Sequence, residues 1–168
     1  FDAMVEALKA AGNPSSVHRA GRSARAIVEK ARRDVAGLVG ALPGEVVFTS
    51  GGTEANNLAL AGSGRRRILI SAVEHDSVLK TPGAEIVSVD GNGVLDLRAL
   101  EQMLAQSREP ALVSVMFANN ETGVFQPLAD VVRIARERGA LVHCDAVQGA
   151  GKAPLDLHGL GVDYMTRS

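Results

Sequence analysis

The chain has 168 residues, a hydrophobic content of 46% and a formal net charge of −1. This length suits one domain, and the hydrophobic content is sufficient for a buried core. The near-zero charge and the aromatic content of only 3% argue against a nucleic-acid partner, because such partners are bound by basic patches and stacking rings.

Predicted helices and strands alternate along the chain. Apolar residues at helical spacing predict helices at 1–8 and 20–38. Further elements follow, in chain order: a strand at 45–49, a helix after the Gly-Gly-Thr turn at 51–53, a strand at 67–71, a short helix at 76–80, a strand at 85–90, a helix at 97–106 capped by Asp96, a strand at 111–117, a helix at 127–138, a strand at 141–144 and a strand-like run near the C-terminus.

Repeated helix–strand units with apolar strands predict an α/β fold, with a mostly parallel sheet and helices on both faces. Ligands of such sheets bind beyond the carboxyl ends of the strands. Polar runs follow the predicted strands at 50–53, 72–75, 118–122 and 145–148. We expect these four runs to converge on one site.

The segment from Thr49 to Asn57 is the most informative of these runs. It passes from an apolar strand-like stretch through Gly51 and Gly52 into an apolar helical stretch. The start of a helix exposes unpaired backbone N–H groups at the positive end of its dipole, which favours an anion and most often a phosphate. Thr53 adds a hydroxyl at this helix start.

Asp145 directly follows an apolar strand, so its carboxylate is expected to be half-buried and to need a partner. A cationic nitrogen of a ligand would serve, although Asp also commonly caps the next turn. Gln148, three residues later, could donate to a ligand oxygen or stabilise its own loop.

His75 ends the run at 71–75 and could stack on a planar ring or move protons, or it could be a structural residue. The turn at 119–123 brings Asn120, whose amide could contact both a ring hydroxyl and a substrate carboxylate. His143 and Asp145 have a spacing found among metal ligands, but no third ligand is evident, so no metal is predicted.

A phosphate loop, an acid for a ring nitrogen, a histidine for ring stacking and amide donors together describe a site for pyridoxal 5′-phosphate. Other glycine runs do not compete with this interpretation. The runs at 62–64 and 149–152 lack the spacing of dinucleotide and nucleotide loops.

In this combination the chain resembles the cysteine desulfurases, a branch of the class V aminotransferases among the fold-type I pyridoxal-phosphate enzymes. The resemblance covers essentially the whole chain. The residues that carry it occur in order at 13–18 with Gly21 and Arg22, at 48–57, at 74–75, at 119–123 with 126–127, and at 143–148 with Gly151 and Lys152.

The resemblance implies a role for each site residue. Gly52, Thr53 and Ser168 would bind the cofactor phosphate. His75 would stack on the pyridine ring and relay protons, and Asp145 would pair with the ring nitrogen, so these two are the catalytic candidates. Gln148 would bond the ring hydroxyl, and Asn120 would contact that hydroxyl and the substrate carboxylate. The reaction would take sulfur from L-cysteine, giving L-alanine and an enzyme persulfide for iron–sulfur cluster or thio-cofactor synthesis.

The family pattern also implies that residues 1–168 form the central part of a cofactor-binding large domain. The family's cofactor-carrying lysine follows three residues after the position of Ser168, and its persulfide cysteine, substrate arginine, small C-terminal domain and N-terminal segment lie outside this sequence. Lys152 and Cys144 do not match those catalytic positions. Alternative interpretations are a selenocysteine lyase, another class V enzyme, or a fragment without activity.

The expected surroundings of the protein follow from the same observations. No apolar run approaches the roughly 18 residues of a membrane helix, so no membrane partner is expected. The single cysteine, Cys144, fits a reducing cytosol, so we expect a cytoplasmic protein. The resemblance further implies a homodimer and a sulfur-acceptor or scaffold protein as partner.

Overall fold

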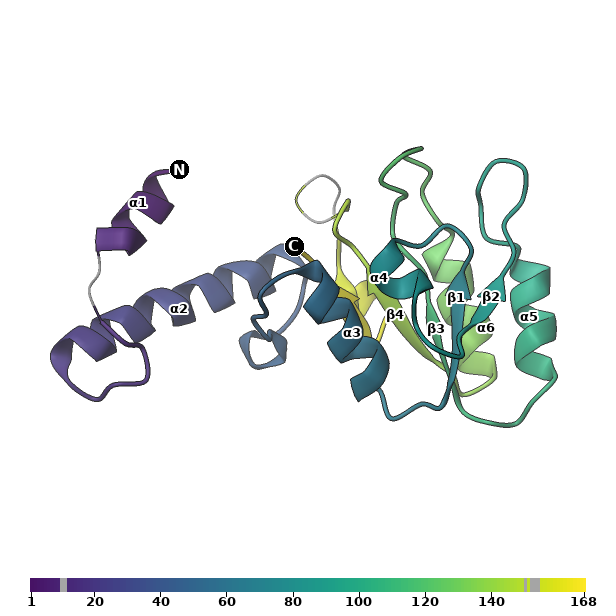
Figure 1. Ribbon diagram of the computed structural model, residues 1–168, viewed down its shortest axis with the longest axis horizontal. Helices are drawn as coiled ribbons and strands as arrows, with labels where there is room; N and C mark the ends of the chain where they lie inside the picture. Colours follow the sequence, from purple (N-terminus) through teal and green to yellow (C-terminus); the bar gives the residue numbers. More distant parts are fainter. Residues whose placement is uncertain (10–11, 150, 152–154) are drawn as a thin grey trace. The chain divides into compact units, whose positions relative to one another are not determined.

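The computed structural model describes residues 1–9, 12–149, 151 and 155–168. The chain divides into two compact units, Phe1–Val47 and Phe48–Ser168. Figure 1 shows the helices of the first unit in purple and blue, and the sheet of the second unit in teal, green and yellow.

The first unit contains α1 (Asp2–Lys9), α2 (Arg19–Leu38) and the 3₁₀ turn η1 (Pro43–Glu45). The start of α2 is capped by His18, whose Nδ1 accepts a hydrogen bond of 3.2 Å from the backbone N–H of Gly21. Because this cap satisfies one of the free N–H groups at the helix start, it fixes where the long predicted helix begins.

The second unit is built on a parallel five-stranded sheet in the order β2-β1-β3-β4-β5. Its strands are β1 (Arg67–Ser71), β2 (Glu85–Val87), β3 (Ala111–Ser114), β4 (Leu141–Asp145) and β5 (Tyr164–Thr166). The chain moves outward from β1 to β2 and then crosses back to β3, so the direction of winding reverses between β1 and β3. Such a reversal opens a crevice at the carboxyl ends of the two strands.

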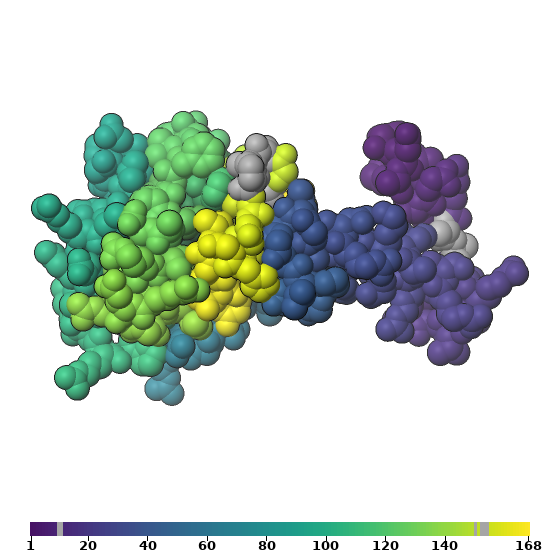
Figure 2. Space-filling view, turned by 180° about the vertical axis from the view of Figure 1, so that it is seen from behind, coloured from purple at the N-terminus to yellow at the C-terminus, as the bar shows by residue number. Residues whose placement is uncertain are grey.

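Helices cover both faces of the sheet, which confirms the predicted α/β architecture. They are α3 (Gly52–Gly62), α4 (Asp76–Leu79), α5 (Leu97–Ala105), α6 (Leu128–Glu137) and α7 (Leu157–Leu160). Helix α3 packs against α4, whereas α6 packs against α5 and α7. The near side of the sheet in Figure 1 carries α3 and α4, and the view from behind in Figure 2 shows the green side chains of α6 beside the yellow C-terminal residues.

The face below α3 and α4 has an apolar part and a polar part. Leu60 of α3, Ile70 of β1, Val78 of α4 and Leu112 of β3 form a buried cluster on this face. Because side chains alternate along a strand, His143 and Asp145 of β4 share a face, while Cys144 between them points to the other side. The carboxyl end of β4 therefore brings its polar side chains beside α3.

The predicted strand at 45–49 is wrong. Residues 43–45 form η1, and residues 46–49 join no strand ladder among the described residues. The run is apolar, but Val47 is 69% exposed and Phe48 is 48% exposed. A strand is held by hydrogen bonds to a neighbouring strand, so an apolar run alone does not form one. Strands β2 and β3 are also shorter than predicted, although the N–H groups of Val115 and Phe117 still bond to the backbone of the β4 strand.

Candidate active site

A cavity of about 290 Å³ opens at the carboxyl ends of β1, β3 and β4, beside the start of α3. All of the site residues predicted from the sequence line it. The lining residues are Gly52, Thr53, Asn56, His75, Ser77, Met116, Ala118, Asn120, Asp145, Val147, Gln148 and Ser168. Strand-end residues far apart in sequence therefore meet in one place, as the parallel sheet predicts, while their individual roles stay predictions.

The start of α3 forms one end of the cavity. Ser50 donates from its backbone N–H and its hydroxyl to the Glu54 carboxylate, both at 2.6 Å, and these bonds lower the pKa of Glu54. They fix the turn through Gly51 and Gly52, and no side chain of the described residues caps the helix. The first backbone N–H groups of α3 therefore remain available to an anion.

Ser168 lies next to this helix start. A Cβ atom placed on Gly52 would stand 3.3 Å from the Cβ of Ser168 and 3.6 Å from a methyl group of Val147. This spacing is tight, so glycine keeps open the space between the helix start and the Ser168 hydroxyl. The backbone N–H groups, Thr53 and Ser168 together form a donor set that fits a phosphate group.

Asp145 lies at the end of β4 and is only 6% exposed. One carboxylate oxygen accepts a bond of 3.0 Å from the backbone N–H of Val147, and the other accepts one of 2.8 Å from the Asn56 amide. Asp145 therefore caps its own turn and also faces the cavity, so the two roles considered from the sequence coexist. Because a carboxylate has about four acceptor positions, two bonds leave room for a cationic ligand nitrogen.

His75 also combines a structural position with a place in the cavity. It is the N-cap of α4, where its Nδ1 accepts a bond of 3.2 Å from the backbone N–H of Ser77. The Ser77 hydroxyl lies 2.8 Å from the same nitrogen. Since Nδ1 accepts, the ring proton is on Nε2, and this nitrogen is left for a ligand.

The two asparagines in the loop after β3, Asn119 and Asn120, make different contacts. The Asn119 carbonyl accepts from the backbone N–H groups of Glu121 and Thr122, both at 2.9 Å, and its amide donates to the Val73 carbonyl at 3.0 Å. Asn119 thus builds the turn and ties it to the segment before His75. Asn120 is exposed and lines the cavity.

Gln148 lies in the turn that follows Asp145. The turn is packed so closely on Phe117 that a Cβ atom on Gly149 would stand 2.3 Å from the Phe117 ring. Glycine is therefore required there, and this close approach holds the turn that brings Gln148 to the cavity.

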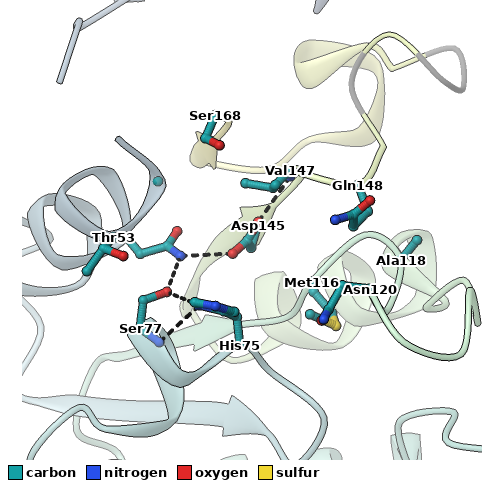
Figure 3. A pocket seen from close by; sticks show the side chains of 12 residues that line it. Thr53, His75, Ser77, Met116, Ala118, Asn120, Asp145, Val147, Gln148 and Ser168 are labelled. Atoms are coloured by element: carbon teal, nitrogen blue, oxygen red, sulfur yellow. Dashed lines mark hydrogen bonds between the residues drawn. The ribbon is translucent and has the colours of Figure 1, made fainter. Parts of the chain in front are cut away.

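The donors are spread across the cavity in an order that fits pyridoxal 5′-phosphate. Figure 3 shows Thr53 and Ser168 on one side, Asn120 and Gln148 on the other, and Asp145 and His75 between them. An anion site at one end, amide groups at the other and a buried carboxylate in the middle match the phosphate, the ring oxygen and the ring nitrogen of that cofactor.

Sequence reasoning missed Asn56, Ser77 and Thr166. Asn56 is 1% exposed and bonds to both Ser77 and Asp145, and the Thr166 hydroxyl donates to the Asn56 carbonyl. One local signal was available, because Asn56 lies one helical turn after Gly52 and so shares its face of α3. The bonds to Asp145 and Thr166 join positions far apart in sequence and carry no local signal.

Three buried ionisable groups, His143, Cys144 and Glu74, lie close enough to Asp145 to be affected by its charge. Burial lowers the pKa of His143 to about 4, against an opposing effect of the Asp145 charge. Burial also raises the pKa of the Cys144 thiol well above its usual value. Glu74 is 5% exposed, and one of its oxygens accepts from the Met116 N–H at 2.5 Å, while its other oxygen has no partner among the described residues.

Glu74→Gln is expected to stabilise the protein at alkaline pH. Burial, reinforced by the Asp145 charge and opposed by the Met116 bond, raises the pKa of Glu74 well above 4.5. The folded state then keeps a proton that the unfolded chain releases, so stability falls as pH rises above 4.5. Chemical unfolding should give the variant a higher free energy of unfolding than wild type at about pH 8, with the difference closing toward acid pH.

Glu101→Gln, at an exposed position of α5, controls for the loss of a carboxyl group as such. A Glu74→Gln effect that is the same at every pH would show that folding does not raise the pKa of Glu74, which would contradict the prediction.

Other candidate sites find no support. No group of three or more His, Cys, Asp or Glu side chains in the described ranges could hold a metal ion. None of the helices in those ranges is both long enough and apolar enough to cross a membrane. Lys152 lies outside the described residues.

Comparison with known proteins gives the same family throughout. The sequence matches the aminotransferase class-V family over residues 1–168. It is 39% identical to the IscS-like cysteine desulfurase of Mycobacterium tuberculosis over 99% of this chain and 47% of that protein. It is 43% identical to a cysteine desulfurase of Sinorhizobium fredii over 94% of this chain and 44% of that protein.

Comparison of the fold with solved structures indicates the same family. A solved NifS-like protein from Rickettsia africae superposes with a TM-score of 0.93 at 37% identity, over 99% of this chain and 49% of that structure. The chain thus spans about half the length of the relatives that it matches. The family match over residues 1–168 confirms the resemblance carried by the strand-end motifs, and the chain belongs to the class-V aminotransferases.

Proposed function

We propose that the protein to which this chain belongs is a pyridoxal 5′-phosphate-dependent cysteine desulfurase. The observation that carries the proposal is the meeting of Thr53, His75, Asn120, Asp145 and Gln148 in one cavity at the carboxyl ends of parallel strands. The relatives named cysteine desulfurase, at 39% and 43% identity, support the same reaction.

The cavity residues would divide the binding of the cofactor between them. The N–H groups at Gly52 and the hydroxyls of Thr53 and Ser168 would hold the phosphate, and Gln148 would bond the ring hydroxyl. When bound, pyridoxal 5′-phosphate supplies an electron sink for bond changes at an amino-acid substrate. Asp145 would hold a negative charge at the ring nitrogen and so keep that nitrogen protonated.

His75 and Asn120 would act on the substrate side. His75 would lie over the ring and hold or move a proton at Nε2, since its Nδ1 is occupied by Ser77. The Asn120 amide would contact the ring hydroxyl and orient the carboxylate of L-cysteine. In the overall reaction L-cysteine and an enzyme thiol become L-alanine and an enzyme persulfide, so atoms and electrons balance without an external oxidant.

The persulfide sulfur would pass to an acceptor or scaffold protein for iron–sulfur cluster or thio-cofactor synthesis. Family resemblance supports a homodimer. The free, buried thiol of Cys144 fits a reducing compartment, so we place the protein in the cytoplasm.

The proposal is tested on the full-length protein with pyridoxal 5′-phosphate, L-cysteine and a thiol reductant. We expect L-alanine and sulfide in equal amounts. Thr53→Ala should weaken cofactor binding by about tenfold, because one hydrogen bond to a charged phosphate is lost. Ser63→Ala, at the other end of α3, is the matched control.

Failure to form L-alanine from L-cysteine by the cofactor-loaded protein would overturn the proposal. Release of L-alanine from L-selenocysteine alone would assign the protein to a selenocysteine lyase instead.

A further inference from the structure

A chain of buried side-chain hydrogen bonds runs beneath the cavity and ends at its acid. The Ser114 hydroxyl lies 2.8 Å from His143 Nδ1, and His143 Nε2 lies 3.2 Å from the Thr166 hydroxyl. Thr166 bonds to the Asn56 carbonyl, and the Asn56 amide donates to Asp145 at 2.8 Å. We call these five residues the buried relay.

The buried relay also branches to the histidine of the cavity. The Asn56 amide donates to the Ser77 hydroxyl at 2.9 Å, and Ser77 in turn bonds to His75 Nδ1. Figure 3 shows the bonds that reach Ser77, His75 and Asp145 as dashed lines. One amide group therefore touches both predicted catalytic side chains, directly or through a single hydroxyl.

Only one direction of donation fits all of these bonds. The Asn56 carbonyl can only accept, so the Thr166 hydroxyl must donate to it. Because the Thr166 hydroxyl has only one proton, it can only accept from His143, so His143 donates to it from Nε2. His143 then accepts from the Ser114 hydroxyl at Nδ1.

The reversed amide is excluded by charge. If Asn56 were turned over, its carbonyl oxygen would face the carboxylate of Asp145, and two acceptors would stand at bonding distance without a proton between them. The observed orientation instead places the two amide hydrogens on Ser77 and Asp145, so every proton of the network has one defined acceptor.

The buried relay is enclosed, which makes this arrangement rigid. Ser114 and His143 are 0% exposed, Asn56 is 1% exposed and Thr166 is 5% exposed. In such surroundings a misdirected polar group is costly, and bonds that run in one direction strengthen one another. The relay lies outside the set of groups expected to touch cofactor or substrate, apart from its end at Asp145 and the edge of Asn56.

We propose that Asn56, held by Thr166 and His143, is a positioning residue that sets the orientation of the Asp145 carboxylate and, through the Ser77 hydroxyl, reinforces the His75 tautomer that the Ser77 backbone N–H also favours. The cavity thereby presents a fixed carboxylate oxygen and a fixed Nε2–H together. What these two groups contact rests on the proposed function, but the direction of the relay does not.

Thr166 offers a matched pair of variants away from the cavity lining. Thr166→Ser keeps the hydroxyl, whereas Thr166→Val keeps the shape and removes it. The first readout is the imidazole ¹⁵N spectrum of the full-length protein without cofactor. We expect the Nε2–H tautomer of His143 in wild type and Thr166→Ser, and a change to Nδ1–H in Thr166→Val, where only Ser114 remains as partner.

The second readout is the pH titration of the bound cofactor's absorbance, with kcat and KM measured beside it. In Thr166→Val we expect a shifted titration midpoint and a kcat lower by roughly tenfold, the rate equivalent of one lost hydrogen bond, with little change in KM. Thr166→Ser should restore both. Ser77→Ala, at a half-buried position that lines the cavity, tests the branch and should alter the ring signals of His75 but not those of His143.

An Nδ1–H tautomer of His143 in wild type would overturn the direction of the relay. Equal cofactor titrations and equal kcat in the two Thr166 variants would overturn its positioning role. If wild type and Thr166→Ser both fail to act on L-cysteine, the proposed function fails, while the tautomer result still decides the relay.

Discussion

Asp145→Ala is expected to leave a folded protein whose kcat for L-cysteine is lower by at least about a hundredfold. Asp145 is the only carboxylate among the described residues that line the cavity, and it is buried. Its removal would leave a protonated ring nitrogen without a counter-charge, so the electron sink would weaken. The measurement is the rate of L-alanine formation by the full-length, cofactor-loaded protein.

Asp145→Asn separates charge from shape in this test. The alanine variant leaves the N–H of Val147 and the amide of Asn56 without their acceptor, which costs about 1–3 kcal/mol of stability. The asparagine variant can still accept from Val147 but has no charge. We expect both variants to be slow, and thermal unfolding should show that both are folded. Turnover near wild type in either variant would remove Asp145 from its proposed role.

His143 is expected to make the protein sensitive to acid. Burial lowers its pKa from 6.5 to about 4 in the folded protein. Between pH 6.5 and about 4, His143 is protonated in the unfolded chain but not in the folded state. Stability is therefore highest above pH 6.5 and is lost as pH falls toward 4. The shift corresponds to about 3 kcal/mol of unfolding free energy at the acid end of this range.

The measurement is chemical unfolding at several pH values for wild type and His143→Gln. The variant should be less stable at neutral pH but should lose less stability on acidification. Comparison with the variant is needed because Glu74 has the opposite pH dependence in part of this range. Cys144→Ala, next to His143 in the sequence, is the control. The pKa of the Cys144 thiol is raised, so this thiol exchanges no proton in the acid range. Parallel pH profiles for wild type and His143→Gln would show that the pKa of His143 is the same in the folded and unfolded states, which would contradict the prediction.

Much of the fold could be predicted because its signals are local. The apolar strand at 67–71 became β1 with the predicted bounds, and Asp96 caps α5 as expected through bonds to the N–H groups of Arg98 and Ala99. The run at 45–49 carried the same apolar signal but formed no strand. Whether a strand forms depends on a partner elsewhere in the chain, which local composition does not reveal.

The candidate site likewise has a part that could be predicted from local signals and a part that could not. The residues at strand ends were found because a parallel sheet brings all carboxyl ends to one edge. The partners behind them were missed because the Asn56–Asp145 bond spans 89 positions and the Asn56–Thr166 bond spans 110. A single buried asparagine on an apolar helix offers no pattern that would identify such partners.

The bond between Thr166 and Asn56 has a consequence for the order in which the protein is made. Asn56 lies on α3, at the beginning of the sheet-bearing unit, whereas Thr166 lies on the edge strand β5, the last strand of the described chain to leave the ribosome. The first four strands can pair before β5 is synthesised, but the amide that orients Asp145 gains its anchor only when β5 docks. Because contacts so distant in sequence form late, the nascent chain acquires a sheet before the cavity around Asp145 is complete.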